Sequence, residues 1–271
     1  MAAPARAARV PPAPALVALE RVEKRFANGT LAVTGLDLAI GRHEFVSLLG
    51  PSGCGKSTAL RMIGGLGAPT AGRIAWPGHG PGVRPARGEV GFVFQEPTLM
   101  PWARVTANIR RPLRLIGVTG AEADRRAAEA LEMVGLSEFA RAFPRELSGG
   151  MRMRVSIARA LATKPQVLLM DEPFAALDEI TRFRLNEDLL DLWRTHSWTV
   201  IFVTHSVFES VFLSNRIVVM TGRPGRVHAD VAIEAPYPRT QAFRMTEAYN
   251  HYCRDVSRAL AEAMAGTVGE D

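Results

Sequence analysis

The sequence predicts a doubly wound α/β protein that begins with an antiparallel β subdomain and carries a helical insert in its middle. Three observations support this fold class. Apolar and polar residues alternate from Leu16 to Ile40, as in half-buried strands. After residue 45, short apolar runs of strand length take turns with helical patterns, and between Arg104 and Arg141 only helical patterns occur. The 271 residues are 47% hydrophobic, which is enough for a sizeable core.

The first half of the chain predicts an antiparallel strand pair followed by a βα unit. "LVALERVEKRF" and "GTLAVTGLDLAI" alternate on either side of the turn dipeptide Asn28-Gly29. "EFVSLLG" is a short apolar strand that ends in a glycine-rich loop, and "KSTALRMIGGL" has helical spacing until Gly64 and Gly65. Residues 66–95 are predicted to be rich in loops, closing on the strand "EVGFVFQ".

The second half predicts the helical insert and the rest of the sheet. "AEADRRAAEALEMVGL" is the clearest helix, with Ala127, Leu131 and Val134 on its apolar side. "QVLLMDEP" and "TVIFVTHS" predict buried parallel strands joined by the helix "EITRFRLNEDLLDLW", and "RIVVMTGRPGRVHADVAIEA" predicts two or three terminal strands. Residues 241–271 predict one amphipathic helix and a tail, with an inward face made of Phe243, Tyr249, Tyr252 and Val256.

Composition narrows the functional classes. Residues 1–15 are rich in Ala, Pro and Arg and have no apolar secretory core, so we expect a disordered tail, with a transit peptide as the alternative. The net charge of +6 rests on scattered arginines, and we interpret it as compositional bias rather than as a nucleic-acid or membrane surface. Cys54 and Cys253 have neither metal-ligand nor disulfide-scaffold spacing, which favours a reducing cytosol. No run of 18 apolar residues occurs, so we expect that any membrane role needs a partner.

Residues 50–57 match the phosphate-loop pattern G-x-x-x-x-G-K-[ST], between a predicted strand and a predicted helix. Gly53 and Gly55 let successive backbone N–H groups converge on a β-phosphate, Lys56 reaches the β and γ oxygens, and Ser57 offers a hydroxyl to Mg²⁺. The side chain of Cys54 is expected to point away, without a catalytic role. The predicted ATP contacts are Gly50, Pro51, Ser52, Gly53, Cys54, Gly55, Lys56, Ser57 and Thr58.

Two acidic residues follow the apolar strand "VLLM", at the edge where a parallel sheet presents its ligand groups. Asp171 is expected to hold Mg²⁺ through water, and Glu172 to act as the base that polarises the attacking water. A lone "DE" after a strand is more often a loop or a helix start, but the phosphate loop upstream favours the catalytic interpretation.

A second glycine-rich stretch, "LSGG" at residues 147–150, lies between these two motifs. With it, residues 16–225 resemble the ATP-binding subunit of ATP-binding cassette (ABC) transporters. Gln95 matches the Q-loop of that family, "LSGGM" its signature, "AALD" at 175–178 its D-loop, and His205 its switch histidine. The resemblance implies a P-loop NTPase with a RecA-like core, an antiparallel β subdomain and an inserted α-helical subdomain at about 96–160, within a nucleotide-binding domain at 16–240.

The family resemblance also implies a head-to-tail dimer, in which each ATP is held by the phosphate loop of one subunit and the signature of the other. The groups that act on the partner's ATP would be Ser148, Gly149, Gly150 and Asp178. Gln95 would sense Mg²⁺ and the attacking water, so the implied catalytic residues are Glu172, His205, Gln95 and Lys56, and the implied metal residues are Ser57, Gln95 and Asp171. Phe26 would stack on adenine. A structural hydrogen-bonding role for His205 and a core role for Phe26 are the alternatives.

The segments "QEPTLMPWARVTANI" and "FVTHSVFESVFLSNRIVVMTGRPGRV" resemble those of importers for nitrate, sulfonates, taurine and pyrimidine precursors. That subfamily implies transmembrane permease subunits as partners, a periplasmic binding protein indirectly, and a position on the cytoplasmic face of the inner membrane. Leu99, Met100 and Trp102 are candidates for the surface that accepts a permease helix, with core packing as the alternative. Met151 and Met153 stand where glutamine is frequent and are expected to remove amides near the ligand.

Two other functions remain open from the sequence. A soluble cassette ATPase could act on nucleic acid or the ribosome, but such proteins carry paired cassettes, zinc modules or long coiled-coil inserts, which this sequence lacks. We therefore expect no nucleic-acid partner. The alternative of a P-loop GTPase lacks support, because the sequence has no N-K-x-D motif and a GTPase would not explain "LSGG".

Overall fold

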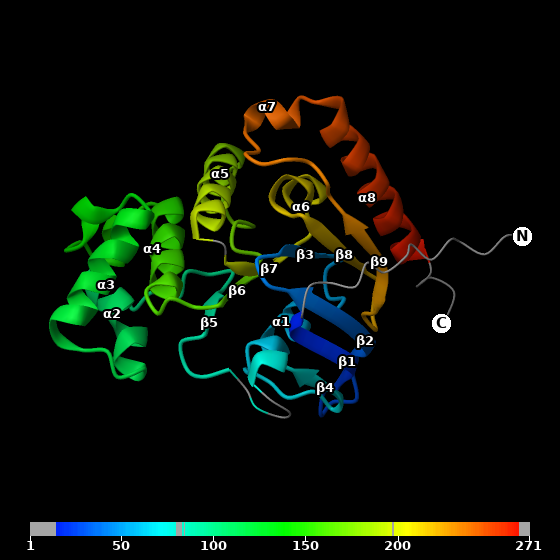
Figure 1. Ribbon diagram of the computed structural model, residues 1–271, viewed down its shortest axis with the longest axis horizontal. Helices are drawn as coiled ribbons and strands as arrows, with labels where there is room; N and C mark the ends of the chain where they lie inside the picture. Colours follow the sequence, from blue (N-terminus) through cyan, green and yellow to red (C-terminus); the bar gives the residue numbers. More distant parts are fainter. Residues whose placement is uncertain (1–14, 80–82, 84, 197, 266–271) are drawn as a thin grey trace, which may run out of the picture.

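The computed structural model describes residues 15–79, 83, 85–196 and 198–265. The predicted disordered tail at 1–15 lies outside these residues, apart from Ala15, which begins the first strand. Two sheets form the framework (Figure 1). The larger sheet has the order β5 (Val90–Val93), β6 (Val167–Asp171), β7 (Thr199–Thr204), β3 (Phe45–Leu49), β8 (Arg216–Met220) and β9 (Val227–Ala232). The smaller sheet has the order β2 (Leu31–Gly41), β1 (Ala15–Arg25) and β4 (Ala71–Ala75).

The larger sheet is covered on both faces. Its strands are parallel except β9, which pairs antiparallel with β8, and every residue of β3, β6 and β7 is buried. Along β3, Val46 and Leu48 belong to one core with the smaller sheet and with α1 (Lys56–Ile63). Phe45 and Leu49 belong to a second core, with α5 (Glu179–His196), α6 (Val207–Leu213) and α8 (Glu247–Ala265) (Figure 1). This two-residue alternation places the core on both sides of the sheet.

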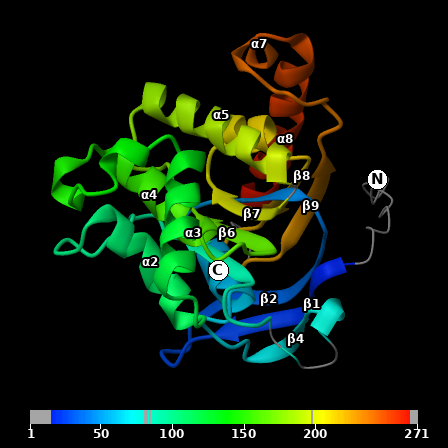
Figure 2. The ribbon, with the colours of Figure 1, turned by 60° about the vertical axis from the view of Figure 1, so that its left-hand side comes forward.

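Three helices form a group beside the β5 and β6 edge of the larger sheet (Figure 2). They are α2 (Val105–Leu115), α3 (Gly120–Met133) and α4 (Gly149–Leu161). Ala127, Leu131 and Val134 are buried against the core, as their helical spacing predicts. Short 3₁₀ turns occur at Pro77–His79, Ser137–Phe139 and Pro144–Glu146. Among the helices of the described residues, none has both the length and the apolar character needed to span a membrane.

The prediction of a loop-rich segment at 66–95, before the strand that becomes β5, is incomplete because it omits β4. Ala71–Ala75 pairs antiparallel with β1, so that Leu19 lies opposite Ile74. The strand is short, and its first three residues are exposed, so it carries no alternating signal. Its partner lies about fifty residues earlier in the chain, and the pairing is therefore not visible in local sequence.

The prediction of one continuous C-terminal helix is also wrong. The structure has a short helix α7 (Gln241–Arg244) and then α8, which begins at Glu247. The Thr246 hydroxyl accepts a hydrogen bond of 3.2 Å from the Tyr249 N–H, and such a cap starts a new helix. Tyr249 and Val256 are buried, whereas Phe243 and Tyr252 are half-buried against the same core.

Candidate functional site

The loop between β3 and α1 has the backbone geometry of a phosphate cradle. Gly53 and Gly55 adopt φ angles of 76° and 98°, a left-handed conformation that side chains rarely take. A Cβ atom on Gly55 would lie 2.7 Å from the carbonyl oxygen of Ala32, so this position also needs glycine for close packing on β2. The Lys56 ammonium donates to the carbonyls of Gly50 and Pro51 at 2.8 and 2.9 Å. The loop therefore curls around the charge that would face a phosphate.

Cys54 lies within this loop and is buried. Its Sγ is 3.9 Å from Lys56 Nζ, and burial raises the pKa of its thiol. Since a nucleophilic cysteine needs the thiolate form, this environment disfavours a catalytic role for Cys54.

Ser57 and Asp171 bring two oxygen ligands together from neighbouring elements. The Ser57 hydroxyl donates to Asp171 Oδ1 at 2.6 Å, across the carboxyl ends of β3 and β6. Burial raises the pKa of the Asp171 carboxyl, while the Ser57 hydrogen bond and the charge of Arg61 oppose that shift. The described residues contain no group of three or more His, Cys, Asp and Glu side chains that could hold a metal alone. A hydroxyl and one carboxylate suit Mg²⁺ that takes its other ligands from phosphate and water.

Glu172 and His205 meet at the same edge, one residue beyond β6 and β7. His205 Nδ1 lies 3.1 Å from Glu172 Oε2, and Lys56 Nζ lies 4.0 Å from Glu172 Oε1. Glu172 has a φ angle of 45°, a costly conformation for a residue with a side chain, of the kind that clusters at functional sites. The His205 ring is 54% exposed, so its hydrogen bond to Glu172 does not serve to satisfy a buried ring. This pair can hold a water and a developing negative charge between its side chains and the phosphate loop.

A buried polar cluster behind this pair was missed by sequence reasoning. The Thr204 hydroxyl hydrogen-bonds Glu209 Oε2 at 2.5 Å, and burial raises the pKa of the Glu209 carboxyl. Glu209, Arg182 and His205 line one small cavity together with Glu172. Glu209 stands four residues after His205 on α6, a spacing that no residue pattern in the sequence singled out.

The second glycine-rich stretch starts α4. The Ser148 side chain caps this helix by accepting from the Met151 N–H at 3.3 Å, and Ser148 itself is exposed. A Cβ atom on Gly150 would lie 2.8 Å from Thr181 Cγ2, so glycine lets α5 approach this helix end closely. The first backbone N–H groups of α4 can therefore bind an anion, as helix N-termini do.

The expectation that Met153 removes an amide near a ligand is wrong. Met153 is 2% exposed and belongs to the hydrophobic core, where a glutamine amide would lack water. Met151 is half-buried and packs against the same core. Both methionines therefore act in packing, where their flexible side chains fill gaps.

The remaining predicted residues lie at three places on the surface. Asp178 Oδ1 accepts from the Thr181 N–H at 2.9 Å, and this hydrogen bond lowers the pKa of the Asp178 carboxyl. Gln95 is exposed, two residues beyond β5. Phe26 is 45% exposed on the turn between β1 and β2, which rules out a core role.

The predicted site thus falls into two groups. One group, at the carboxyl edge of the larger sheet, contains the phosphate loop, Asp171, Glu172 and His205. The other contains the start of α4 and the Asp178 loop, because a Cβ atom on Gly149 would lie 3.5 Å from Leu177. Throughout the described residues, no hydrogen bond joins Ser148 to the phosphate loop.

The residues proposed as a partner surface after Gln95 differ in their exposure. Trp102 is 77% exposed, whereas Leu99 packs against the core. The backbone of Met100 is fixed on both sides by the Asn108 amide, at 2.7 and 3.2 Å. Core packing therefore accounts for Leu99, and Trp102 remains available as a surface residue.

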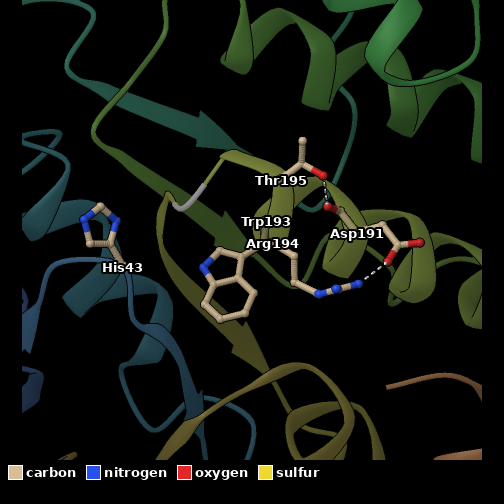
Figure 3. A pocket seen from close by; sticks show the side chains of 5 residues that line it. All are labelled: His43, Asp191, Trp193, Arg194 and Thr195. Carbon is tan, nitrogen blue, oxygen red and sulfur yellow. Dashed lines mark hydrogen bonds and ion pairs between the residues drawn. The ribbon is translucent and has the colours of Figure 1, made fainter. Parts of the chain in front are cut away.

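A larger hollow of about 500 Å³ lies elsewhere and holds none of the predicted residues. His43, Asp191, Trp193, Arg194 and Thr195 line it, and Arg194 pairs with Asp191 (Figure 3). These residues precede β3 and β7, so the hollow lies at the amino ends of the strands. Ligands of doubly wound sheets bind at the carboxyl ends, which favours the first group as the functional centre.

Comparison with known proteins identifies related sequences and structures. The ABC transporter family model matches residues 33–175. A putative ATP-binding protein of Brucella abortus is 45% identical over 222 residues, covering 81% of this chain and 84% of that protein. An aliphatic sulfonates import ATP-binding protein of Bacillus licheniformis is 43% identical over 225 residues, covering 81% and 85%. A dimeric ATP-binding cassette solved in a post-hydrolysis state with ADP and Pi is 34% identical, with a TM-score of 0.70, and matches 81% of this chain and all of that one. The predicted fold class is thereby confirmed.

Proposed function

Because the chain belongs to the ABC transporter family, as its ATP-binding and ATP-hydrolysing subunit, we propose that it powers the import of a small anionic solute of the sulfonate class. The pair formed by Glu172 and His205, 3.1 Å apart beside the phosphate loop, is the observation that carries the catalytic part of this proposal. The solute class rests on the relatives named for sulfonate import.

The chemistry assigned to the residues follows from their positions. Lys56 and the amides of the phosphate loop bind the β- and γ-phosphates of ATP and orient them. Glu172 accepts the proton of the attacking water, and His205 donates a hydrogen bond where charge develops on the γ-phosphate. Ser57 and Asp171 would hold Mg²⁺, which neutralises phosphate charge when bound, and exposed Gln95 completes that ligand set.

The second group completes the site of another copy. Ser148, Gly149 and Gly150 present a helix N-terminus, which fits the negative charge of a γ-phosphate. We assign this end to the ATP of the partner subunit, because cassettes similar to this chain are solved as dimers, one of them with ADP and Pi. Asp178 would link the two sites across the dimer, and the turn residue Phe26 would stack on the adenine.

Transport requires further partners. A permease that spans the membrane would pack one of its helices against the surface that contains the exposed Trp102. A periplasmic binding protein would deliver the solute to that permease. In this arrangement the chain would lie at the cytoplasmic face of the inner membrane. Nitrate, taurine and pyrimidine precursors are the other solutes that the import subfamily suggests.

Solute uptake in the source cells tests the proposal. Cells carrying Glu172→Gln in the genomic copy are compared with the parent for uptake of labelled ethanesulfonate, taurine, nitrate and a pyrimidine precursor. Loss of ethanesulfonate uptake, of taurine uptake or of both supports the sulfonate assignment, because taurine is itself a sulfonate. Loss of nitrate uptake alone, or of pyrimidine-precursor uptake alone, replaces that solute class. Unchanged uptake of all four, with the purified variant unable to hydrolyse ATP, contradicts the import function.

A further inference from the structure

Arg159, in the last turns of α4, binds the loop that follows Gln95. Its Nη1 donates to the Thr98 carbonyl at 2.8 Å, and its Nη2 donates to the Pro97 carbonyl and to Thr98 Oγ1, both at 2.9 Å. A further bond of 3.3 Å reaches Ser156 Oγ on the same helix. One side chain thus holds two consecutive residues of a loop that lies sixty residues earlier in the chain.

The loop residue held most firmly has an unusual backbone. Thr98 adopts a φ angle of 46°, which is uncommon for any residue other than glycine and unfavourable for a β-branched one. Two of the three hydrogen bonds from Arg159 to the loop end on Thr98, at its carbonyl and its hydroxyl. These bonds stabilise the left-handed conformation that sets the course of the chain between Gln95 and Trp102.

The shape of the arginine matters as much as its charge. All the acceptors of Arg159 are neutral carbonyls and hydroxyls, and burial lowers the pKa of its guanidinium. A planar guanidinium can bond several fixed acceptors at once, whereas a lysine ammonium is a single point donor. The contact is therefore a geometric clamp rather than an ion pair.

The same helix carries the signature at its other end. Ser148 caps α4, and Arg159 lies eleven residues further along it, about 16 Å at the helical rise. Gln95 follows β5 at the carboxyl edge of the larger sheet, beside the end of β6 that carries Asp171 and Glu172, whereas Ser148 is assigned to the partner's nucleotide. The Arg159 clamp joins these two loops through one rigid helix.

We propose that Arg159 is a positioning residue that makes the Gln95 loop and the signature helix move as one body, so that ATP bound in a subunit's own site aligns its signature for the partner's ATP. This inference rests on the proposed function, in which both loops contact nucleotide.

The test uses the full chain in the Glu172→Gln background, where we expect ATP-driven dimers to accumulate. Arg159→Gln is compared with Arg154→Gln, a matched control on the same helix that bonds Asp188 and the Val134 carbonyl instead. Three quantities are measured: the Kd of fluorescent ATP for the monomer, the ATP concentration at half-maximal dimerisation, and hydrogen exchange at residues 95–101.

We expect Arg159→Gln to leave the monomer Kd within about twofold and to raise the half-maximal ATP concentration by about tenfold. Exchange at 95–101 should become about tenfold faster while exchange in α4 stays unchanged. Arg154→Gln should change none of these three quantities. A general loss of stability would instead speed exchange throughout the chain, and this would contradict a positioning role.

The proposal is overturned if the Arg159→Gln protein dimerises at the same ATP concentration as its parent. Arg159→Lys keeps the charge and the aliphatic stem, and it is the test variant if Arg159→Gln fails to fold. The lysine variant should show the same shift in half-maximal ATP, and parental behaviour would refute the clamp. Failure of the Glu172→Gln parent itself to dimerise would refute the proposed function, and the two failures are therefore distinguishable.

Discussion

Gly150 should be the less replaceable of the two signature glycines, because of a neighbour on α5. A Cβ atom added at Gly150 would lie 2.8 Å from Thr181 Cγ2, whereas one added at Gly149 would lie 3.5 Å from Leu177 Cδ2. The first distance is a steric overlap and the second is an ordinary contact. Gly150→Ala therefore tests whether the packing of α5 on α4 shapes the signature.

The magnitude follows from two opposing effects. Alanine in place of glycine stabilises a helix by about 0.5–1 kcal/mol, because it restricts the unfolded chain. Overpacking in a tight contact costs about 1–3 kcal/mol. Gly149→Ala should thus be neutral or stabilising, and Gly150→Ala should be less stable than Gly149→Ala by about 1–3 kcal/mol.

The assay is urea unfolding of five proteins: the wild type, Gly149→Ala, Gly150→Ala, Thr181→Ser, and the double variant of Gly150→Ala with Thr181→Ser. Serine lacks the Cγ2 atom but keeps the hydroxyl, so Thr181→Ser should recover most of the stability lost in Gly150→Ala. The expected coupling energy between the two positions is about 1–3 kcal/mol. Equal free energies of unfolding for Gly150→Ala and Gly149→Ala, with no coupling to Thr181, would refute the steric argument.

Three further predictions concern catalysis, the partner surface and pH. Glu172→Gln should lower kcat about 100-fold or more, since a general base contributes about that much, and should leave the Kd for ATP unchanged. An ATPase assay measures kcat, and a fluorescence titration measures the Kd. Because Trp102 is 77% exposed, Trp102→Ala should change the free energy of unfolding by less than about 0.5 kcal/mol. The same variant should uncouple solute uptake from ATPase activity. Loss of folding would refute the surface role. The core-packed Leu99→Ala should instead destabilise the fold by about 1–3 kcal/mol. Burial raises the pKa of the Glu209 carboxyl in the folded state. Above the ordinary carboxyl range the folded protein therefore binds more protons than the unfolded chain, and the wild-type free energy of unfolding should fall as pH rises. Urea unfolding at a series of pH values above the ordinary carboxyl range should show a smaller fall for Glu209→Gln than for the wild type, and an equal fall in both proteins would contradict this prediction.

The sheet and its site edge were predictable because their signals are local. Each buried strand is one apolar run, and the phosphate loop, Asp171 and His205 each follow such a run directly. Parallel strands align their carboxyl ends, so residues far apart in sequence meet at one edge. The 2.6 Å bond between Ser57 and Asp171 is the outcome of that rule.

The features that were missed depend on partners far away in the chain. β4 forms only by pairing with β1, and its own residues are small or exposed. Arg239 is buried and donates to five backbone carbonyls, for example those of Val211 and Ser214. Its flanking sequence has no regular apolar pattern and gives no sign of this burial. Arg159 is a similar case, because its acceptors lie sixty residues upstream. Some of the scattered arginines are therefore buried hydrogen-bond donors, which the net charge of the sequence does not reveal.

If each ATP is held between the phosphate loop of one subunit and the signature of the other, Glu172→Gln should dimerise at saturating ATP, which sedimentation equilibrium measures. The expected mass is twice that of the 29.4 kDa subunit, and adding Ser148→Arg should return it to the monomer mass with ATP still bound at the phosphate loop. A monomer of Glu172→Gln at saturating ATP, or a dimer unaffected by Ser148→Arg, would contradict the shared ATP sites.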